Sequence, residues 1–230
     1  MVTRPGAKPL ADELERLGAE VTLVPLIEIR RAEDRGAPAE AIASFSTYDW
    51  IVLTSVNGVA AVSEGLTGLA GPRVAAVGPV TASAIRERGV EPAFVASRAS
   101  EDIAAGLGEI EGKRVLMPQA DIAEPALAEE LRGRGAEVDV VVAYRTVLVE
   151  PPADEIRMLR AADAIVVASG SACRSLAAAG GTNGRTTLVC IGPKTAKVAR
   201  EVGLKVGLVA DETTSDGIIR ALVSHFGETS

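Results

Sequence analysis

The sequence predicts an α/β protein of two similar lobes, each a five-stranded parallel sheet flanked by helices, joined by a two-stranded antiparallel linker. Three observations predict this fold. The chain contains an internal repeat, its short apolar runs alternate with amphipathic stretches, and two β-prone segments lie where the chain would cross between lobes.

The repeat is the clearest of these signals. Four segments recur in the same order, each about 115 residues further along the chain. Residues 10–21 match 127–138, 49–55 match 163–169, 77–82 match 191–196, and 100–103 match 215–218. Two copies of one unit therefore make up the chain.

The apolar runs have the length of strands and do not alternate with polar residues, as expected where both faces of a sheet are covered. Five runs are assigned to the first lobe: 1–5, 20–25, 164–169, 188–191 and 205–209. Five are assigned to the second: 50–55, 74–77, 92–95, 115–118 and 137–141.

The sequence also predicts where helices begin and end. Pro79 and Pro193 suit first helical turns, because proline has no N–H to lose there. Ser100 and Ser215 are N-cap candidates, and glycines such as Gly18 and Gly135 are expected to close helices.

This assignment makes the first lobe discontinuous. It comprises residues 1–28 and 148–230, and the second lobe comprises residues 33–143. The chain would then cross near residues 26–31 and 142–148, and both crossings are β-prone. The alternative is a serial arrangement in which each repeat folds by itself.

Composition excludes several classes of protein. A net charge of −7, a pI near 5.0 and 3% aromatic residues argue against a nucleic-acid partner, which requires clustered cations and stacking surfaces. No apolar run approaches the length of about 20 residues that spans a bilayer, so no membrane contact is expected. The opening residues lack the apolar region of a signal peptide, so we expect a cytoplasmic protein.

Metal, nucleotide and triad chemistry are not predicted. The chain has one histidine, His225, and two cysteines, Cys173 and Cys190, whose spacing fits neither a disulfide framework nor a metal knuckle. The phosphate-loop, dinucleotide-binding, zinc-protease and nucleophile-elbow motifs are also missing from the sequence.

Polar residues instead follow the predicted strands, where parallel α/β sheets bind ligands. Each has a plain alternative, because Ser, Thr and Asn at a helix start are more often caps than ligands. Together they would place donors at one edge of each lobe, and two such edges facing each other would form a cleft for a large anion. The candidate binding residues are Arg4, Ser55, Asn57, Thr81, Ser169, Gly170, Ser171, Lys194 and Thr195.

The ordered set of segments resembles the uroporphyrinogen-III synthase family. The resemblance rests on residues 2–5 (VTRP), 49–59 (DWIVLTSVNGV), 77–82 (VGPVTA), 143–146 (AYRT) and 191–196 (IGPKTA). It departs from the family at Gln119, where a basic residue would be expected after the strand at 115–118.

The resemblance implies a bilobal fold and a lyase that cyclises hydroxymethylbilane to uroporphyrinogen III, with ring D inverted and water lost. It implies no metal and no organic cofactor. The partners it implies are this small-molecule substrate and a transient contact with the preceding enzyme of the pathway, and we expect a monomer.

Because the pyrrole nitrogen already activates the leaving hydroxyl, the enzyme's main task is to position the substrate. A phenol beside the cleft could assist departure of the hydroxyl by donating a hydrogen bond. Tyr144, on the second crossing, is the candidate catalytic residue, and the alternative is a tyrosine that only packs across the linker.

Two other functions fit the same fold signals. One is a two-lobed protein that binds a small molecule without transforming it, and the other is an inactive paralogue. The isomer formed from hydroxymethylbilane distinguishes them from the enzyme.

Overall fold

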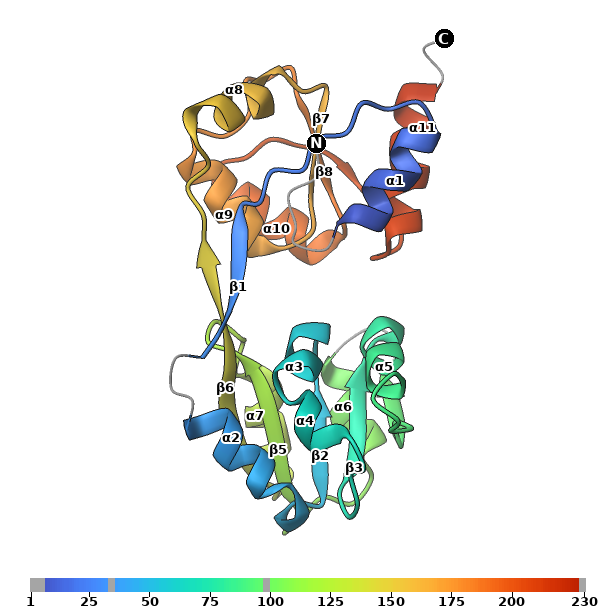
Figure 1. Cartoon of the computed structure of the whole chain (residues 1–230), viewed down its shortest axis with the longest axis vertical. Coiled ribbons are helices and arrows are strands. Elements are labelled where there is room, and N and C mark those ends of the chain that lie inside the picture. Colours follow the sequence, from blue (N-terminus) through green and yellow to red (C-terminus); the bar gives the residue numbers. More distant parts are fainter. Residues whose placement is uncertain (1–6, 33–35, 97–99, 228–230) are drawn as a thin grey trace. The chain divides into compact units, whose positions relative to one another are not determined.

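The computed structural model describes residues 7–32, 36–96 and 100–227. Internal contacts divide the chain into two compact units: unit 1 comprises Met1–Glu28 and Val147–Ser230, and unit 2 comprises Ile29–Thr146. Both units are built from parallel strands and helices, so the chain has a mixed α/β fold (Figure 1).

The sheet of unit 2 has the order β1-β6-β5-β2-β3-β4. The pairs β2–β3, β3–β4, β2–β5 and β5–β6 are parallel. Its strands are β1 (Ile27–Arg31), β2 (Trp50–Leu53), β3 (Arg73–Val77), β4 (Phe94–Ala96), β5 (Arg114–Ala120) and β6 (Glu137–Leu148).

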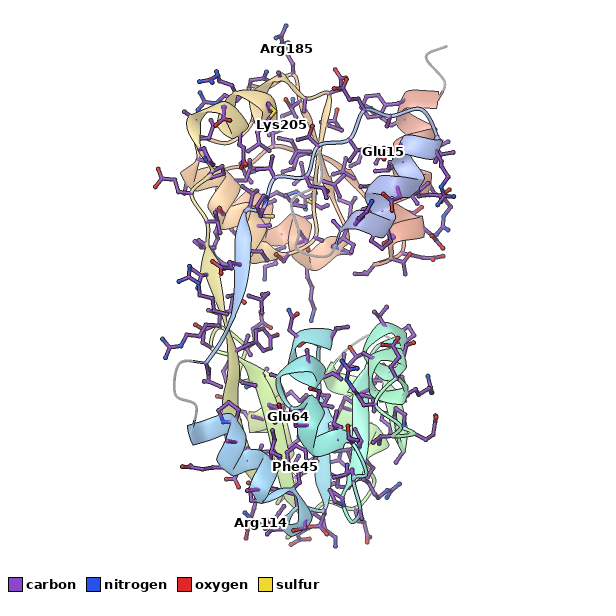
Figure 2. The ribbon with its side chains drawn as sticks, in the orientation of Figure 1. Glu15, Phe45, Glu64, Arg114, Arg185 and Lys205 are labelled. Carbon is purple, nitrogen blue, oxygen red and sulfur yellow. The ribbon has the colours of Figure 1, made fainter. Side chains whose placement is uncertain are left out.

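Helices cover both faces of this sheet, which explains why its strands are apolar on both sides. One face packs against α2 (Gly36–Ala43), the short 3₁₀ turn Phe45–Thr47, α3 (Val56–Ala61), α4 (Ser63–Leu66) and α5 (Pro79–Arg86). The other packs against α6 (Ser100–Gly106) and α7 (Ala126–Gly133). Phe45, labelled in Figure 2, is buried in the first of these layers.

Unit 1 contains a parallel sheet of β7 (Ala164–Val167), β8 (Thr187–Cys190) and β9 (Val206–Val209) in that order. One face packs against α8 (Ala153–Ala161), α9 (Gly170–Ala178) and α10 (Pro193–Glu201). The other packs against α1 (Lys8–Arg16) and α11 (Ser215–Phe226), which lie side by side (Figure 1).

The described strands form sheets of six and three, where five and five were expected. Unit 2 gains a strand because residues 27–31, predicted as a linker crossing, are hydrogen-bonded beside β6. In unit 1, residues 20–25 form only a single bridge at Leu23, in a segment where Pro25 has no N–H to donate to a ladder. The remaining predicted strand, 1–5, lies outside the described residues.

Equivalent residues of the two repeats begin or end equivalent helices. Pro79 and Pro193 occupy the first turns of α5 and α10, as predicted. The repeat partners Gly18 and Gly135 adopt φ values of 91° and 86° just after α1 and α7, a conformation that favours glycine. At α11, however, Thr214 rather than Ser215 is the cap, because the Thr214 hydroxyl accepts the Gly217 N–H.

Among the helices of the described residues, none is both long enough and apolar enough to cross a membrane.

Candidate active site

The strand order of unit 2 creates a switch point between β2 and β5. From β2 the chain builds outward through β3 and β4, and it then returns to the other side of β2 as β5 and β6. In open parallel sheets, ligands bind beyond the carboxyl ends of strands at such a point. Ser55 follows β2 and Asp121 follows β5, so these two residues flank it.

Ser55 is the N-cap of α3. Its extended backbone, with φ −157° and ψ 156°, directs the side chain to accept the Gly58 N–H at 3.0 Å. Gly58 also lets the helix start lie close to β5, because a Cβ on this residue would be only 3.1 Å from the Pro118 carbonyl oxygen. The local sequence therefore fixes the Ser55 hydroxyl at the switch point.

Tyr144 reaches the same point from β6. Gln119 of β5 pairs with Val142, but Ala120 pairs with Tyr144, so β6 carries one extra residue, Ala143, at this position. Such a bulge redirects the side chains that follow it. Ala143 and Tyr144 are both buried, which breaks the alternation of an ordinary strand.

The two hydroxyls meet. Ser55 Oγ and Tyr144 Oη lie 2.9 Å apart, and the hydrogen bond between them allows either group to donate. Since Ser55 Oγ also accepts the Gly58 N–H, a chain of hydrogen bonds runs from the start of α3 through the serine to the phenol. A phenol held in this way can donate a proton to a ligand, and the serine can stabilise the charge left behind.

The other predicted residues of unit 2 lie in helix first turns at this edge. Asn57 is exposed in α3, whereas Thr81 of α5 is buried at 5% exposure. Burial of its side chain leaves Thr81 little surface to offer a ligand.

Unit 1 repeats the arrangement without a phenol. Ser169 caps α9 with φ −156° and ψ 156°, and its hydroxyl accepts the Ala172 N–H at 3.1 Å. Both tyrosines of the chain, Tyr48 and Tyr144, belong to unit 2. The two serine caps are therefore alike in backbone geometry and differ in their partners.

The remaining predicted residues of unit 1 gather at the starts of α9 and α10, two helices that pack together. Ser171 and Thr195 are buried, and Lys194 is exposed. At Gly170 a Cβ would lie 3.0 Å from Val198 of α10, so this glycine permits close helix packing. Arg4 lies outside the described residues.

Three exposed apolar side chains at the edge of unit 2 were missed from the sequence. Val56, Val80 and Ile122 are 43%, 64% and 56% exposed, and they follow β2, β3 and β5 respectively. Val56 and Val80 lie in the first turns of α3 and α5, and Ile122 lies in the turn after β5, so the available signal was a large apolar residue shortly after a strand end. Gln119, the departure noted above, is buried within β5 itself.

The side chains that commonly bind metal ions are not clustered in the described residues. The described residues contain no group of three or more His, Cys, Asp or Glu side chains able to hold an ion. Cys173 and Cys190 are free and buried. The hydrogen bond that the Cys173 thiol donates to Cys190, together with burial, raises the pKa of the Cys173 thiol, which disfavours its reactive thiolate form.

Two hollows on unit 2 lie away from the Ser55–Tyr144 pair. One, of about 400 Å³, is lined by residues that include Asp49, Trp50 and Arg73, at the amino ends of β2 and β3. The other lies along residues 138–141 of β6 and the end of α2. Arg114, labelled in Figure 2, is the first residue of β5 and forms an ion pair with Asp139 of β6. Because ligands of parallel sheets bind at the carboxyl ends, the hydroxyl pair is the better candidate.

A parallel α/β unit with two hydroxyls at its switch point has the arrangement in which proteins of the open-sheet class bind ligands. The family model for uroporphyrinogen-III synthase HemD matches residues 8–220 of the chain. The chain belongs to the uroporphyrinogen-III synthase family.

Individual relatives agree with this assignment. The chain is 29% identical over 244 residues to the porphyrin biosynthesis protein HemD of Ruminiclostridium josui, covering 99% of this chain but 48% of that protein. It is 27% identical to the uroporphyrinogen-III synthase of Synechococcus elongatus, covering 97% of this chain and 93% of that one. A mutant uroporphyrinogen III synthase of Thermus thermophilus has a similar fold, with a TM-score of 0.67, 19% identity and coverage of 99% and 98%.

Family membership favours an enzyme of this class over a binding protein or an inactive paralogue.

Proposed function

We propose that this chain converts hydroxymethylbilane to uroporphyrinogen III, with Tyr144 donating to the hydroxyl that leaves. The observation that carries the proposal is the 2.9 Å hydrogen bond between Ser55 and Tyr144 at the switch point of unit 2. Family membership supports the reaction, and the geometry of this pair supports the role of the phenol.

The donors and acceptors that remain on Ser55 and Tyr144 indicate the direction of the hydrogen bond between them. Ser55 Oγ already accepts the Gly58 N–H, so its own proton is free to be donated to Tyr144 Oη. The phenol proton is then free for the substrate. Each donor in such a chain polarises the next, which strengthens the last one.

The proton balance closes without a metal or an organic cofactor. As the C–O bond of the hydroxymethyl group breaks, the phenol proton joins the departing hydroxyl, giving water, an azafulvene cation and a phenolate. The methylene carbon that has lost the hydroxyl then bonds to the substituted α-carbon of ring D and forms a spiro intermediate. The bond between that α-carbon and the methylene on ring C breaks, the released methylene bonds to the free α-carbon of ring D, and the ring is thereby inverted. The proton lost when the pyrrole regains aromaticity restores the phenol.

Substrate carboxylates require donors, because the chain carries a net charge of −7. The starts of α3, α5, α9 and α10 follow strands, and backbone N–H groups of a first helical turn have no partner within the helix, which suits them to bind anions. Asn57 and Lys194 add exposed side-chain donors there, and we assign Arg4 the same role from the sequence. Thr81, Ser171 and Thr195 are buried at these helix starts, so we propose no direct contact between their side chains and the substrate.

The division of the chain into two compact units supports the proposal of two lobes. Their boundaries fall at Glu28–Ile29 and Thr146–Val147. The Val149 N–H, just after β6, donates to the Leu26 carbonyl, just before β1, so the two crossing segments are paired. This pairing supports an antiparallel linker between two lobes.

The test is the isomer formed. Purified protein is incubated with hydroxymethylbilane generated by the preceding enzyme of the pathway, and the oxidised products are separated by chromatography. Accumulation of isomer III above the no-protein control supports the proposal. Isomer I alone, at the spontaneous rate, would mean that the chain binds without catalysis.

A further inference from the structure

Tyr144 lies at the end of the hydrogen-bonded pairing between β5 and β6. Ala120, the last residue of β5, pairs with Tyr144, while β6 continues to Leu148. The bulge at Ala143 directly precedes the tyrosine and interrupts the regular ladder. β1 flanks the other edge of β6, so it is on the β5 side that the backbone beyond this point needs another contact.

Asp121 supplies that contact on both sides of residue 145. Its backbone N–H donates to the Tyr144 carbonyl at 3.1 Å, and its carboxylate Oδ1 accepts the Thr146 N–H at 3.1 Å. The side chain thus extends the ladder by one hydrogen bond after β5 has turned away. Thr146 is also the last residue of unit 2, so the bond anchors β6 where the strand leaves this unit.

A long side chain magnifies small backbone rotations. The phenol oxygen is the atom of Tyr144 farthest from its backbone, so a change at residues 144–146 moves it more than it moves the strand. Catalysis by positioning is sensitive to displacements of about 1 Å. The 2.9 Å bond to Ser55 is the contact that such a displacement would break.

We propose that Asp121 is a positioning residue for Tyr144, acting through the Thr146 N–H rather than by touching substrate. Its effect on activity rests on the function proposed above, but its effect on the position of the phenol does not. Charge is not required for this role. What is required is an acceptor oxygen at the place of Oδ1.

Three substitutions separate these requirements. Asp121→Ala removes the acceptor, and Asp121→Asn keeps an oxygen in the same place without the charge. Asp121→Glu keeps the charge but displaces the oxygen by one methylene. Asp121 is an exposed turn residue, and its backbone N–H remains in all three variants, so each is expected to fold.

The readout that does not depend on activity is fluorine NMR of protein labelled with 3-fluorotyrosine. The chain has two tyrosines, so two resonances are expected, and Tyr48→Phe assigns them. We expect Asp121→Ala and Asp121→Glu to shift or broaden the Tyr144 resonance, with Tyr48 unchanged. Asp121→Asn should leave both resonances as in the wild type.

The same variants are then assayed for isomer III. We expect kcat to fall about 5- to 20-fold in Asp121→Ala and Asp121→Glu, with KM within about two-fold, and Asp121→Asn to retain most of the activity. An unchanged Tyr144 resonance in Asp121→Ala would overturn the proposal, as would Asp121→Asn behaving like Asp121→Ala. If the wild type makes no isomer III, the NMR arm still decides whether Asp121 positions the tyrosine.

Discussion

Ser55 Oγ and Tyr144 Oη lie 2.9 Å apart although 89 residues separate them in the sequence. Three local features bring them together: the N-cap of α3, the close approach of Gly58 to Pro118, and the bulge at Ala143. Their shared consequence is a phenol held against a hydroxyl at the switch point of a parallel sheet.

Tyr144→Phe removes the phenol hydroxyl and keeps the ring. We expect the rate of isomer III formation to fall about 10- to 150-fold, because a hydrogen bond to a developing charge contributes about 1.5–3 kcal/mol. Initial rates with freshly generated hydroxymethylbilane measure this, with circular dichroism as the folding control. A rate equal to that of the wild type would show that Tyr144 only packs.

Ser55→Ala and Ser169→Ala form a matched pair, because both serines cap helices with the same backbone geometry. Each substitution should lower the free energy of unfolding by about 1 kcal/mol, the usual contribution of an N-cap. Only Ser55→Ala should also lower the rate substantially, by up to about 10-fold, since only this serine contacts the phenol.

Urea denaturation and initial rates provide the two measurements for this pair. Equal losses of rate in the two variants would show that capping, and not the contact with Tyr144, determines the effect.

Gly58→Ala tests the close approach of α3 to β5. A Cβ at this position would lie 3.1 Å from the Pro118 carbonyl oxygen, a backbone atom that cannot rotate away. We expect a loss of about 1–2 kcal/mol in stability together with a reduced rate, because the start of α3 carries Ser55.

Gly170→Ala is the control, since the atoms nearest to its Cβ would belong to the Val198 side chain in unit 1. It should cost stability with a smaller effect on rate. A wild-type rate in Gly58→Ala would show that the close approach of α3 to β5 is not needed to position the Ser55 hydroxyl.

Asp49→Asn tests an ion pair at the opposite edge of the unit 2 sheet. The Arg114 backbone N–H and the Lys113 ammonium hold the pKa of the Asp49 carboxyl below its usual value. A depressed pKa in the folded state stabilises the protein above the unfolded pKa of about 3.9, and this contribution is lost as pH falls through the folded pKa.

Asp49→Asn should therefore be less stable than the wild type at neutral pH, by under about 1 kcal/mol for a partly exposed pair. The difference should shrink in acid. Denaturation curves at several pH values measure it, and a difference that grows as pH falls would contradict the assignment.

Chelators should leave activity unchanged. The sequence has one histidine, both cysteines are buried, and the reaction as proposed needs only protons from side chains and solvent. The measurement is the rate after exhaustive dialysis against a chelator. Activity that is lost and then restored by a divalent cation would show that an ion takes part.

Local features were predictable from the sequence because they depend on neighbouring residues. Serine after an apolar run predicted the position of Ser55 and Ser169 at helix starts, and Pro79 and Pro193 marked first turns. At α11, two adjacent hydroxyl residues offered a choice, and Thr214 takes the cap that Ser215 was expected to provide.

Long-range features were not predictable in the same way. The bulge at Ala143 is a mismatch of register between two strands, so neither strand reveals it alone. Asp121 was missed because its role depends on the Thr146 N–H, which lies 25 residues away. The sequence predicted residues 27–31 as one strand of a linker, but it did not predict that this strand continues the six-stranded sheet beside β6.

The most direct test of the account is a double-mutant cycle on Ser55 and Tyr144, measured as the rate of isomer III formation. If Ser55 acts through the phenol, Ser55→Ala should have little further effect once Tyr144→Phe is present, so the double variant should match Tyr144→Phe alone. If the two effects instead multiply as those of independent sites do, the hydroxyl pair is not the catalytic unit and the account is wrong.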